Sequence, residues 1–157
     1  MLSGPEHARA KQNVRSLRID ARPESLAEIR RFVRATAAAE GLDQERADGL
    51  VQAVDESATN VIVHGYRLAP GEIEIEARRD GDDLVVLLRD RAPRFDPTTV
   101  PAPDLHRPTR GRRAGGMGIH LARALCDEVR YRAMPGGGNE LALVQHAGDD
   151  KGPRPGR

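Results

Sequence analysis

An acid and an amide stand four residues apart at Glu56 and Asn60, in a segment whose apolar residues recur at helical spacing. Residues four apart share a face of a helix, and by angle this face lies opposite the stripe that includes Val54, Ala58 and Val61. The two polar side chains are therefore expected to point outward together. A solvated helix face also explains such a pair, and for the pair alone we favour that explanation.

A second candidate is Asp90, which ends an apolar segment and precedes a long irregular one. A buried carboxylate at such a place can accept a hydrogen bond from an exocyclic amine, which is one way to recognise adenine. Acids at the ends of strands are also common turn formers, and taken alone Asp90 fits that interpretation better.

A third candidate is the sequence GGMG at residues 115–118, which runs directly into a predicted helix. Glycines let backbone N–H groups approach an anion closely, and a helix start adds unpaired donors and a positive dipole end, which suits phosphate. Four side chains that could reach the same phosphates precede it: Arg107, Arg110, Arg112 and Arg113. A Gly-rich turn that caps an ordinary helix explains this segment about as well, and its spacing matches neither the Walker nor the dinucleotide-binding fingerprint.

The composition excludes several classes of protein. Lys plus Arg (25) nearly equals Asp plus Glu (24), and aromatic residues make up 3% with no Trp, which argues against nucleic-acid binding. The single Cys126 excludes an intramolecular disulfide framework and cannot by itself form a zinc site. No apolar run is long enough to cross a bilayer, and the N-terminus lacks an apolar signal segment, so a cytoplasmic protein without membrane contact is expected.

Hydrophobic periodicity predicts the elements that position these candidates. In chain order they are a strand at 13–19, a helix at 24–39 closed by Gly41, a helix at 43–63 with Asp43 as N-cap, strands at 72–78 and 83–89 joined by a turn at 80–82, a helix at 117–126, and a last hairpin at 128–133 and 140–145. The intervening stretch of about 92–116 is rich in Pro, Arg and Gly and long for a loop, which is typical of a functional segment.

This order predicts one α+β domain at residues 13–146, a two-layer sandwich in which helices cover one face of a mixed, mostly antiparallel sheet. Residues 1–12 and 147–157 are polar or rich in Gly and Pro, and we predict that both are disordered tails.

The three candidates also arrive in the order of a known family. Residues 53–66 (AVDESATNVIVHGY) resemble the N box of the GHKL ATPases, in the form found in RsbW-type anti-sigma-factor serine kinases. Residues 90–97 (DRAPRFDP) are similar to its first glycine box, 115–131 (GGMGIHLARALCDEVRY) to its second, and 137–141 (GGNEL) to its closing hairpin. The resemblance covers about residues 15–145 and implies a Bergerat-type ATP-binding fold. We interpret the HGY that ends the N box as packing and helix termination.

The resemblance implies a role for each candidate. Asn60 would coordinate Mg²⁺ on the phosphates of ATP, Glu56 would orient or deprotonate the attacking hydroxyl, and Asp90 would bind the adenine amine. Residues 97–114 would form the ATP lid. The residues implied to contact the nucleotide are Asn60, Asp90, Arg110, Arg112, Arg113, Gly115, Gly116, Met117, Gly118 and Asn139.

One departure from the family lies in the first glycine box. The family has Asp-x-Gly, whereas this chain has Ala92 two residues after Asp90, followed by Pro93. A methyl group where the nucleotide approaches the backbone predicts a lower affinity for ATP.

By resemblance, the expected function is that of an ATP-dependent serine protein kinase and anti-sigma regulatory factor. It would phosphorylate an anti-sigma-factor antagonist, sequester a sigma factor, and form a homodimer. The alternative is a non-catalytic partner-switching adaptor that binds regulators with weak ATP turnover or none. Retention of Glu56 and Asn60 favours the enzyme, and Ala92 favours the adaptor.

Overall fold

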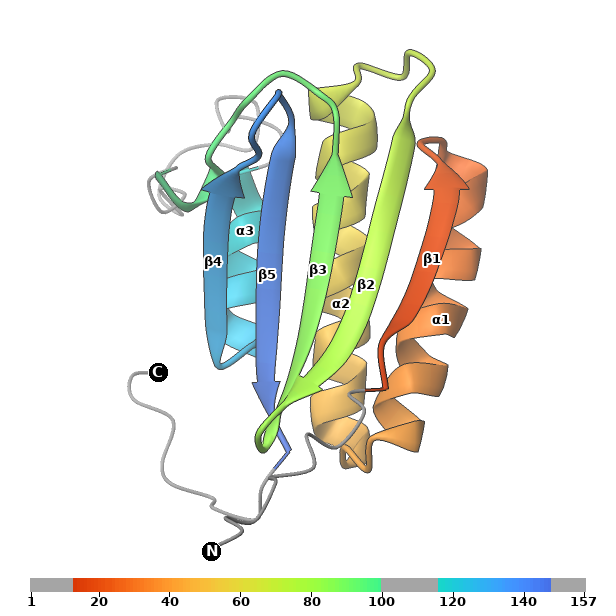
Figure 1. The fold of residues 1–157 in the computed structure, drawn as a ribbon, viewed down its shortest axis with the longest axis vertical. Coiled ribbons are helices and arrows are strands. Elements are labelled where there is room, and N and C mark those ends of the chain that lie inside the picture. Colours follow the sequence, from red (N-terminus) through yellow and green to blue (C-terminus); the bar gives the residue numbers. More distant parts are fainter. Residues whose placement is uncertain (1–12, 100–115, 148–157) are drawn as a thin grey trace, which may run out of the picture.

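The computed structural model of the chain describes residues 13–99 and 116–147. Within these residues, five strands form one sheet in the order β1-β2-β3-β5-β4, and three α-helices cover one of its faces (Figure 1). The α+β sandwich predicted from the sequence is confirmed. All four strand pairings are antiparallel, so the described sheet has no parallel part.

The elements lie within a few residues of their predicted positions. In chain order they are β1 Arg15–Asp20, α1 Leu26–Ala39, α2 Gln44–Asn60, β2 Glu72–Asp80, β3 Asp83–Asp90, α3 Gly116–Leu125, β4 Glu128–Ala133 and β5 Asn139–His146. Short 3-10 turns at Pro23–Ser25 and Pro97–Thr99 and a π-helical turn at Val61–Gly65 complete the described structure. Apart from Ala147, the predicted tails lie outside the described residues, as does most of the predicted lid.

Local signals set the ends of the first two helices. Gly41 takes a φ of 76° just after α1, a conformation that glycine adopts at little cost. The carboxylate of Asp43 then accepts a hydrogen bond from the backbone N–H of Arg46 at 2.8 Å, which caps the start of α2. Both positions are those predicted from the sequence.

The far end of α2 differs from the prediction. The α-helix was expected to continue to Val63, but it ends at Asn60 and passes into the π-helical turn Val61–Gly65. The backbone N–H of Tyr66 bonds to the carbonyl of Val61 at 2.8 Å, five residues back, which widens this last turn. Such turns are rare and concentrate at functional positions in helices.

The core lies between the helices and the covered face of the sheet. Alternate residues of β2, Ile73 and Ile75, are fully buried there, as are Leu50 and Val54 of α2. Because side chains alternate across a strand, each strand turns one apolar face toward the helices, and these faces together form the sheet side of the core.

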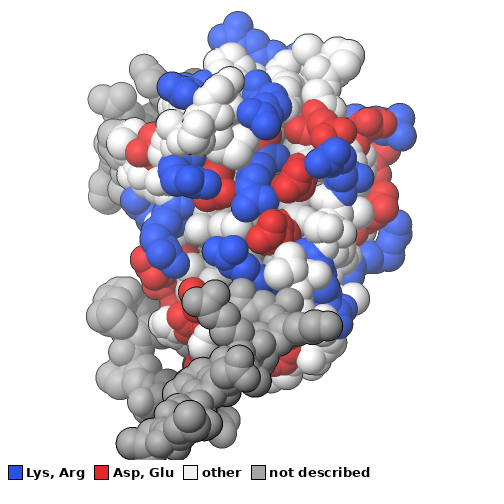
Figure 2. Space-filling view, in the orientation of Figure 1, with Lys and Arg blue, Asp and Glu red and all other residues white. Residues whose placement is uncertain are grey.

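The opposite face of the sheet carries charges of both signs (Figure 2). Arg89 lies near the end of β3, the middle strand, and donates to Glu74 and Glu76 at 3.0 Å each and to Glu140 at 2.7 Å. A small apolar cluster lies on the same side of the sheet: Val85, Leu87, Ala142 and Val144. The charged side chains therefore shield this face without a second helical layer.

Among the described residues, no helix has the length and apolar character needed to cross a membrane.

Candidate functional site

The ends of four elements converge at one edge of the sandwich. In Figure 1, α2 ends, β3 ends and β5 begins at the upper end, and α3 begins toward that same end. The register of the sheet pairs Asp90, the last residue of β3, with Asn139, the first residue of β5. The three predicted candidates, at Glu56 and Asn60, at Asp90 and at the start of α3, thus lie at the same end of the sandwich although they are far apart in the sequence.

Most polar side chains near the end of α2 are already bonded within the protein. Asp55 forms an ion pair with Arg30 of α1 at 2.8 Å. The hydroxyls of Ser57 and Thr59 donate to carbonyl oxygens of their own helix, at 2.7 and 2.8 Å. These residues therefore hold the helix in place and have little left to offer a ligand.

Glu56 and Asn60 differ from these neighbours. Both are half-buried, and no hydrogen bond or ion pair within the described residues uses either side chain. They lie off the buried stripe that contains Val54 and Ala58, as the helical angle predicts. An acid and an amide to which no described residue bonds therefore stand one turn apart at the converging end of α2.

Asp90 is a buried carboxylate with one occupied oxygen. Its residue is 5% exposed, and its Oδ1 accepts from the backbone N–H of Ala92 and from Nδ2 of Asn139, both at 2.9 Å. Burial raises the pKa of Asp90 above its usual value, and these two hydrogen bonds act in the opposite direction. Among the described residues, no donor bonds to Oδ2, so the lone pairs of this oxygen have no described partner.

Asn139 connects Asp90 to its surroundings. Its Nδ2 also lies 3.3 Å from the carbonyl oxygen of Ala92 and 3.2 Å from that of Pro93. Its Oδ1 accepts from the backbone N–H of Phe95 at 2.9 Å and from the hydroxyl of Tyr131 at 2.7 Å. Both ends of this side chain are bonded inside the protein.

The end of α2 directly contacts the loop after β3. The hydroxyl of Tyr66 accepts from the backbone N–H of Arg91 at 2.7 Å and donates to the carbonyl of Glu72 at 2.8 Å. A Cβ built at Gly65 would lie 3.1 Å from the Cβ of Ala92, so the Ala92 methyl occupies the space next to this glycine. The interpretation of residues 64–66 as packing and helix termination agrees with these contacts.

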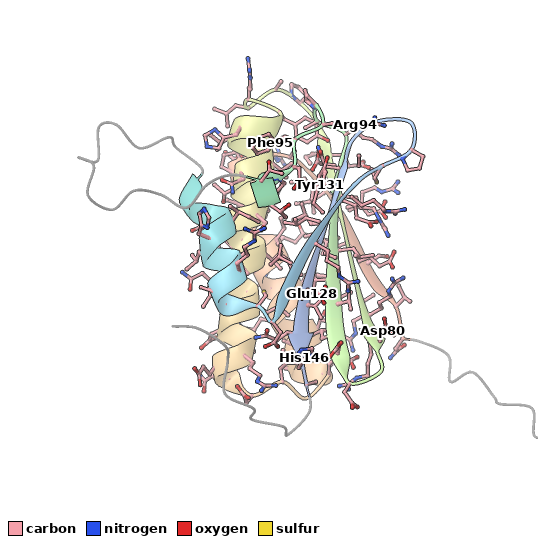
Figure 3. All side chains as sticks on the ribbon, turned by 90° about the vertical axis from the view of Figure 1, so that its left-hand side faces the viewer. Asp80, Arg94, Phe95, Glu128, Tyr131 and His146 are labelled. Carbon is pink, nitrogen blue, oxygen red and sulfur yellow. The ribbon has the colours of Figure 1, made fainter. Side chains whose placement is uncertain are left out.

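Three arginines anchor the rest of this loop. Arg91 donates to the carbonyl of Gly137 at 3.0 Å, and Arg94 donates to that of Met134 at 2.8 Å. Arg123 of α3 donates to the carbonyl of Thr98 at 2.8 Å. Figure 3 shows Arg94, Phe95 and Tyr131 at the same end of the molecule, with Asp80 and His146 toward the other. The loop is thereby tied to the last hairpin and to α3.

The predicted phosphate-binding residues are described only in part. Gly116, Met117 and Gly118 form the first turn of α3, which agrees with a Gly-rich helix start. Arg107, Arg110, Arg112, Arg113 and Gly115 lie outside the described residues.

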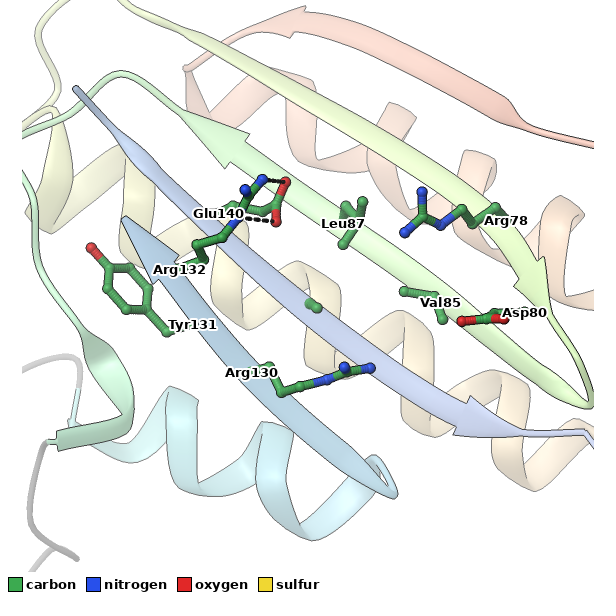
Figure 4. A pocket seen from close by; sticks show the side chains of 9 residues that line it. Arg78, Asp80, Val85, Leu87, Arg130, Tyr131, Arg132 and Glu140 are labelled. Carbon is green, nitrogen blue, oxygen red and sulfur yellow. Dashed lines mark hydrogen bonds and ion pairs between the residues drawn. The ribbon is translucent and has the colours of Figure 1, made fainter. Parts of the chain in front are cut away.

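A separate hollow of about 370 Å³ lies on the helix-free face of the sheet (Figure 4). Its floor includes Val85 and Leu87, and its arginines are each paired with a glutamate. These pairs are Arg78 with Glu76, Arg130 with Glu128, and Arg132 with Glu140. Because these charges are already compensated, the hollow offers little to bind a charged ligand.

Sequence reasoning identified the acid, the amide and the buried carboxylate, but it missed Tyr131. The chain contains only two tyrosines, and the hydroxyls of both bond to atoms next to Asp90, one through Arg91 and one through Asn139. This scarcity is the one signal that could have drawn attention to them. No group of three or more His, Cys, Asp or Glu side chains in the described residues is arranged to hold a metal ion.

Comparison with known proteins gives three kinds of similarity. Residues 19–145 match the family of histidine kinase-like ATPase domains. The anti-sigma F factor of Thermoanaerobacter sp. (strain X514) is 27% identical over 99 residues, 63% of this chain and 69% of that protein. The serine-protein kinase RsbW of Bacillus mycoides (strain KBAB4) is 25% identical over 118 residues, 73% of this chain and 74% of that protein.

A similar fold occurs in the crystal structure of the RsbU and RsbW domains of Rv1364c from Mycobacterium tuberculosis. The TM-score is 0.60 at 22% identity, over 85% of this chain and 31% of that one. At this identity the likeness concerns the fold alone.

Proposed function

Because the chain belongs to the family of histidine kinase-like ATPase domains, we propose that it is an ATP-dependent serine kinase that acts as an anti-sigma regulatory factor. It transfers phosphate to a serine of a small antagonist protein and otherwise sequesters a sigma factor. The names of its relatives, an anti-sigma F factor and the serine-protein kinase RsbW, support both halves of this proposal.

One observation carries the proposal. Glu56 and Asn60, to whose side chains no described residue bonds, lie at the same end of the sandwich as Oδ2 of Asp90. Contacts of Tyr66 and Gly65 with the loop after β3 connect the two places. To bind one nucleotide, the residue that recognises adenine (Asp90) and the residues that face the phosphates (Glu56 and Asn60) must lie on one surface.

The base is recognised through Asp90. An ionised carboxylate accepts hydrogen bonds and donates none, so the open Oδ2 fits the exocyclic amine of adenine. A 6-oxo purine would place an acceptor against this acceptor, which disfavours it.

The chemistry is assigned to α2. The oxygen of the acceptor serine attacks the γ-phosphorus, the bond between that phosphorus and the β,γ-bridging oxygen breaks, and ADP leaves. Glu56 holds the serine hydroxyl and takes its proton. The start of α3 directs backbone N–H groups and a positive dipole end toward the phosphates.

Asn60 fits the expected place of Mg²⁺. Magnesium is commonly held by few protein oxygens together with substrate phosphates, and the carbonyl oxygen of the Asn60 side chain, to which no described residue bonds, can serve as one ligand. When bound, the ion supplies neutralisation of phosphate charge.

The direct test combines the purified chain with γ-labelled ATP, Mg²⁺ and an antagonist-like protein encoded next to it. The proposal predicts phosphoserine on that protein and none when ATP or the chain is omitted. If the two proteins form a complex and no phosphoserine appears at any ATP concentration, the kinase assignment is wrong.

The adaptor remains the second candidate because of Ala92, which replaces the glycine of the family pattern next to Asp90. It predicts stable binding of the antagonist or the sigma factor, with no dependence on nucleotide. Complex formation measured with and without Mg-ATP distinguishes the two candidates.

A further inference from the structure

The side chain of Asn139 lies between acceptors on one side and donors on the other. Its Nδ2 faces Oδ1 of Asp90 at 2.9 Å and two backbone carbonyl oxygens at 3.2 and 3.3 Å. Its Oδ1 faces the N–H of Phe95 at 2.9 Å and the hydroxyl of Tyr131 at 2.7 Å. Turning the amide over would place oxygen against three acceptors and nitrogen against the N–H of Phe95, so this network fixes its orientation.

The fixed amide decides how Asp90 is used. Oδ1 of Asp90 receives two donors, from Asn139 and from the backbone of Ala92, whereas no described donor reaches Oδ2. Oδ1 is therefore occupied by hydrogen bonds within the protein, whereas Oδ2 has no described partner and can accept a hydrogen bond from a ligand.

We propose that Tyr131 and Asn139 are positioning residues that hold Asp90 with Oδ2 free as an acceptor, and that they thereby set the preference of the site for a 6-amino purine over a 6-oxo purine. This inference rests on the proposed nucleotide site. It assigns to Tyr131 and Asn139 a role in selectivity that needs no contact with the nucleotide, in place of the direct contact that the family resemblance implies for Asn139.

The arrangement matters because burial favours the neutral form of a carboxyl group. Desolvation raises the pKa of Asp90, and the hydrogen bond from Asn139 opposes that rise. A neutral Asp90 carries a proton that can be donated to a 6-oxo group, so loss of the Asn139 donor weakens discrimination between the two purines.

The chain offers a matched control for Tyr131. Tyr66 is the other tyrosine, and its hydroxyl bonds to the backbone N–H of Arg91 without touching the carboxyl of Asp90 or the amide of Asn139. Removing one hydroxyl at either position therefore makes the same chemical change on two sides of Asp90. Only the change at Tyr131 acts on the amide that bonds to Asp90.

The experiment measures the dissociation constants of Mg-ATP and Mg-inosine triphosphate, its 6-oxo analogue, by calorimetry. The proteins are the parent, Tyr131→Phe, Asn139→Ala and Tyr66→Phe. We expect the parent to prefer ATP and Tyr131→Phe to lower that preference by roughly threefold to tenfold, the value of one hydrogen bond. Asn139→Ala should lower it further, and Tyr66→Phe should change both affinities by the same factor.

Two results overturn the inference, and they differ. If the parent prefers ATP and both Tyr131→Phe and Asn139→Ala keep its ratio, the positioning role is wrong and the nucleotide site stands. If the parent binds neither nucleotide at millimolar concentration, the proposed function itself fails. Should Asn139→Ala not fold, Tyr131→Phe alone decides, because it keeps the ring that packs against the core.

Discussion

Gly138 lies so close to the backbone of Asp90 that a Cβ built on it would stand 2.1 Å from the carbonyl oxygen of Asp90. Gly138 also has a φ of 94°, which side chains rarely adopt. The residue that enters β5 therefore has to be glycine if Asn139 is to reach the carboxyl of Asp90 from the neighbouring position. The geometry of the candidate site depends on this one backbone contact.

Gly138→Ala should accordingly destabilise the protein by at least about 2 kcal/mol, since the strain of a positive φ adds to a backbone clash. Gly136→Ala is the control in the same turn: its φ is 85°, but nothing lies within 4 Å of its Cβ. It should cost only about 1 kcal/mol, from the backbone conformation alone. Urea unfolding of both variants measures the difference, and equal losses would show that the contact with Asp90 relaxes freely.

The pair of His146 and Asp83 predicts a pH dependence at the other end of the sheet. The hydrogen bond with Asp83 raises the pKa of His146 above its usual 6.5. A raised pKa stabilises the fold below the unfolded value, and this contribution disappears as the pH rises through the folded value. Both side chains are partly exposed, so the effect should stay below about 1 kcal/mol.

We therefore expect the free energy of unfolding of the parent to fall relative to that of His146→Gln as the pH rises from about 6 to about 9. Asp83→Asn should remove the same slope, because it removes the partner. Parallel curves for parent and variants over this range would mean that the pair makes no net contribution in solution.

Much of this fold follows from local sequence signals. Asp43 caps α2 because a short acidic side chain can reach the free N–H of Arg46, three residues on. The alternation that buries Ile73 and Ile75 is a property of any strand with one covered face. Such features depend on neighbours a few residues away, so the pattern of residue types predicts them.

The internal bonding of the site does not follow from local signals. Asp90 and Asn139 are 49 residues apart, and they meet because β3 and β5 pair in one particular register. The bond from Tyr131 to Asn139 requires a second register, that of β4 on β5. The β3–β5 register joins strands that are distant in the sequence, so no local signal sets it, and the bond between Tyr131 and Asn139 acquires its meaning for the site only once that register brings Asn139 to Asp90.

Arg89 supports a prediction about the helix-free face. It bonds to Glu74, Glu76 and Glu140, so its removal would leave three neighbouring carboxylates with only their other partners, which are Arg18, Arg78 and Arg132. Arg89→Leu should therefore cost about 1–3 kcal/mol at neutral pH. Arg130→Leu is the control on β4, because this exposed arginine pairs with Glu128 alone, and it should change stability by less than about 0.5 kcal/mol.

The cost of Arg89→Leu should also depend on pH. Burial acts to raise the pKa of Glu140, but hydrogen bonds from Arg132 and Arg89 hold it below its usual value. Such a group stabilises the fold above the unfolded pKa of 4.5, and this contribution is lost as the pH falls through the folded value. The gap between parent and Arg89→Leu should thus narrow below about pH 4, and a gap that stays constant would point to lost packing instead.

Asn60→Ala should weaken the binding of Mg-ATP, because it removes the side-chain oxygen that we assign to the metal ion. Binding of ATP in the presence of EDTA should be much less affected, which separates loss of the metal ligand from general damage to the site. Calorimetry with and without Mg²⁺ makes the comparison. If the variant loses the same factor under both conditions, Asn60 acts on the nucleotide or on the fold and is not a metal ligand.

Glu56→Gln separates chemistry from binding. The substitution keeps the shape and polarity of the side chain but removes the carboxylate that takes the proton of the attacking serine. Phosphorylation of the antagonist should fall by roughly a hundredfold or more, while the affinity for Mg-ATP and the stability change little. Asp55→Asn makes the same change of an acid to an amide at the adjacent residue. The carboxylate of Asp55 is paired with Arg30 of α1 and is not assigned to the nucleotide site. This substitution should therefore leave the rate of phosphorylation within a few-fold of the parent. A Glu56→Gln variant that phosphorylates the antagonist at the parent rate would show that Glu56 is only a solvated helix residue, and the catalytic base would have to be sought elsewhere in the chain.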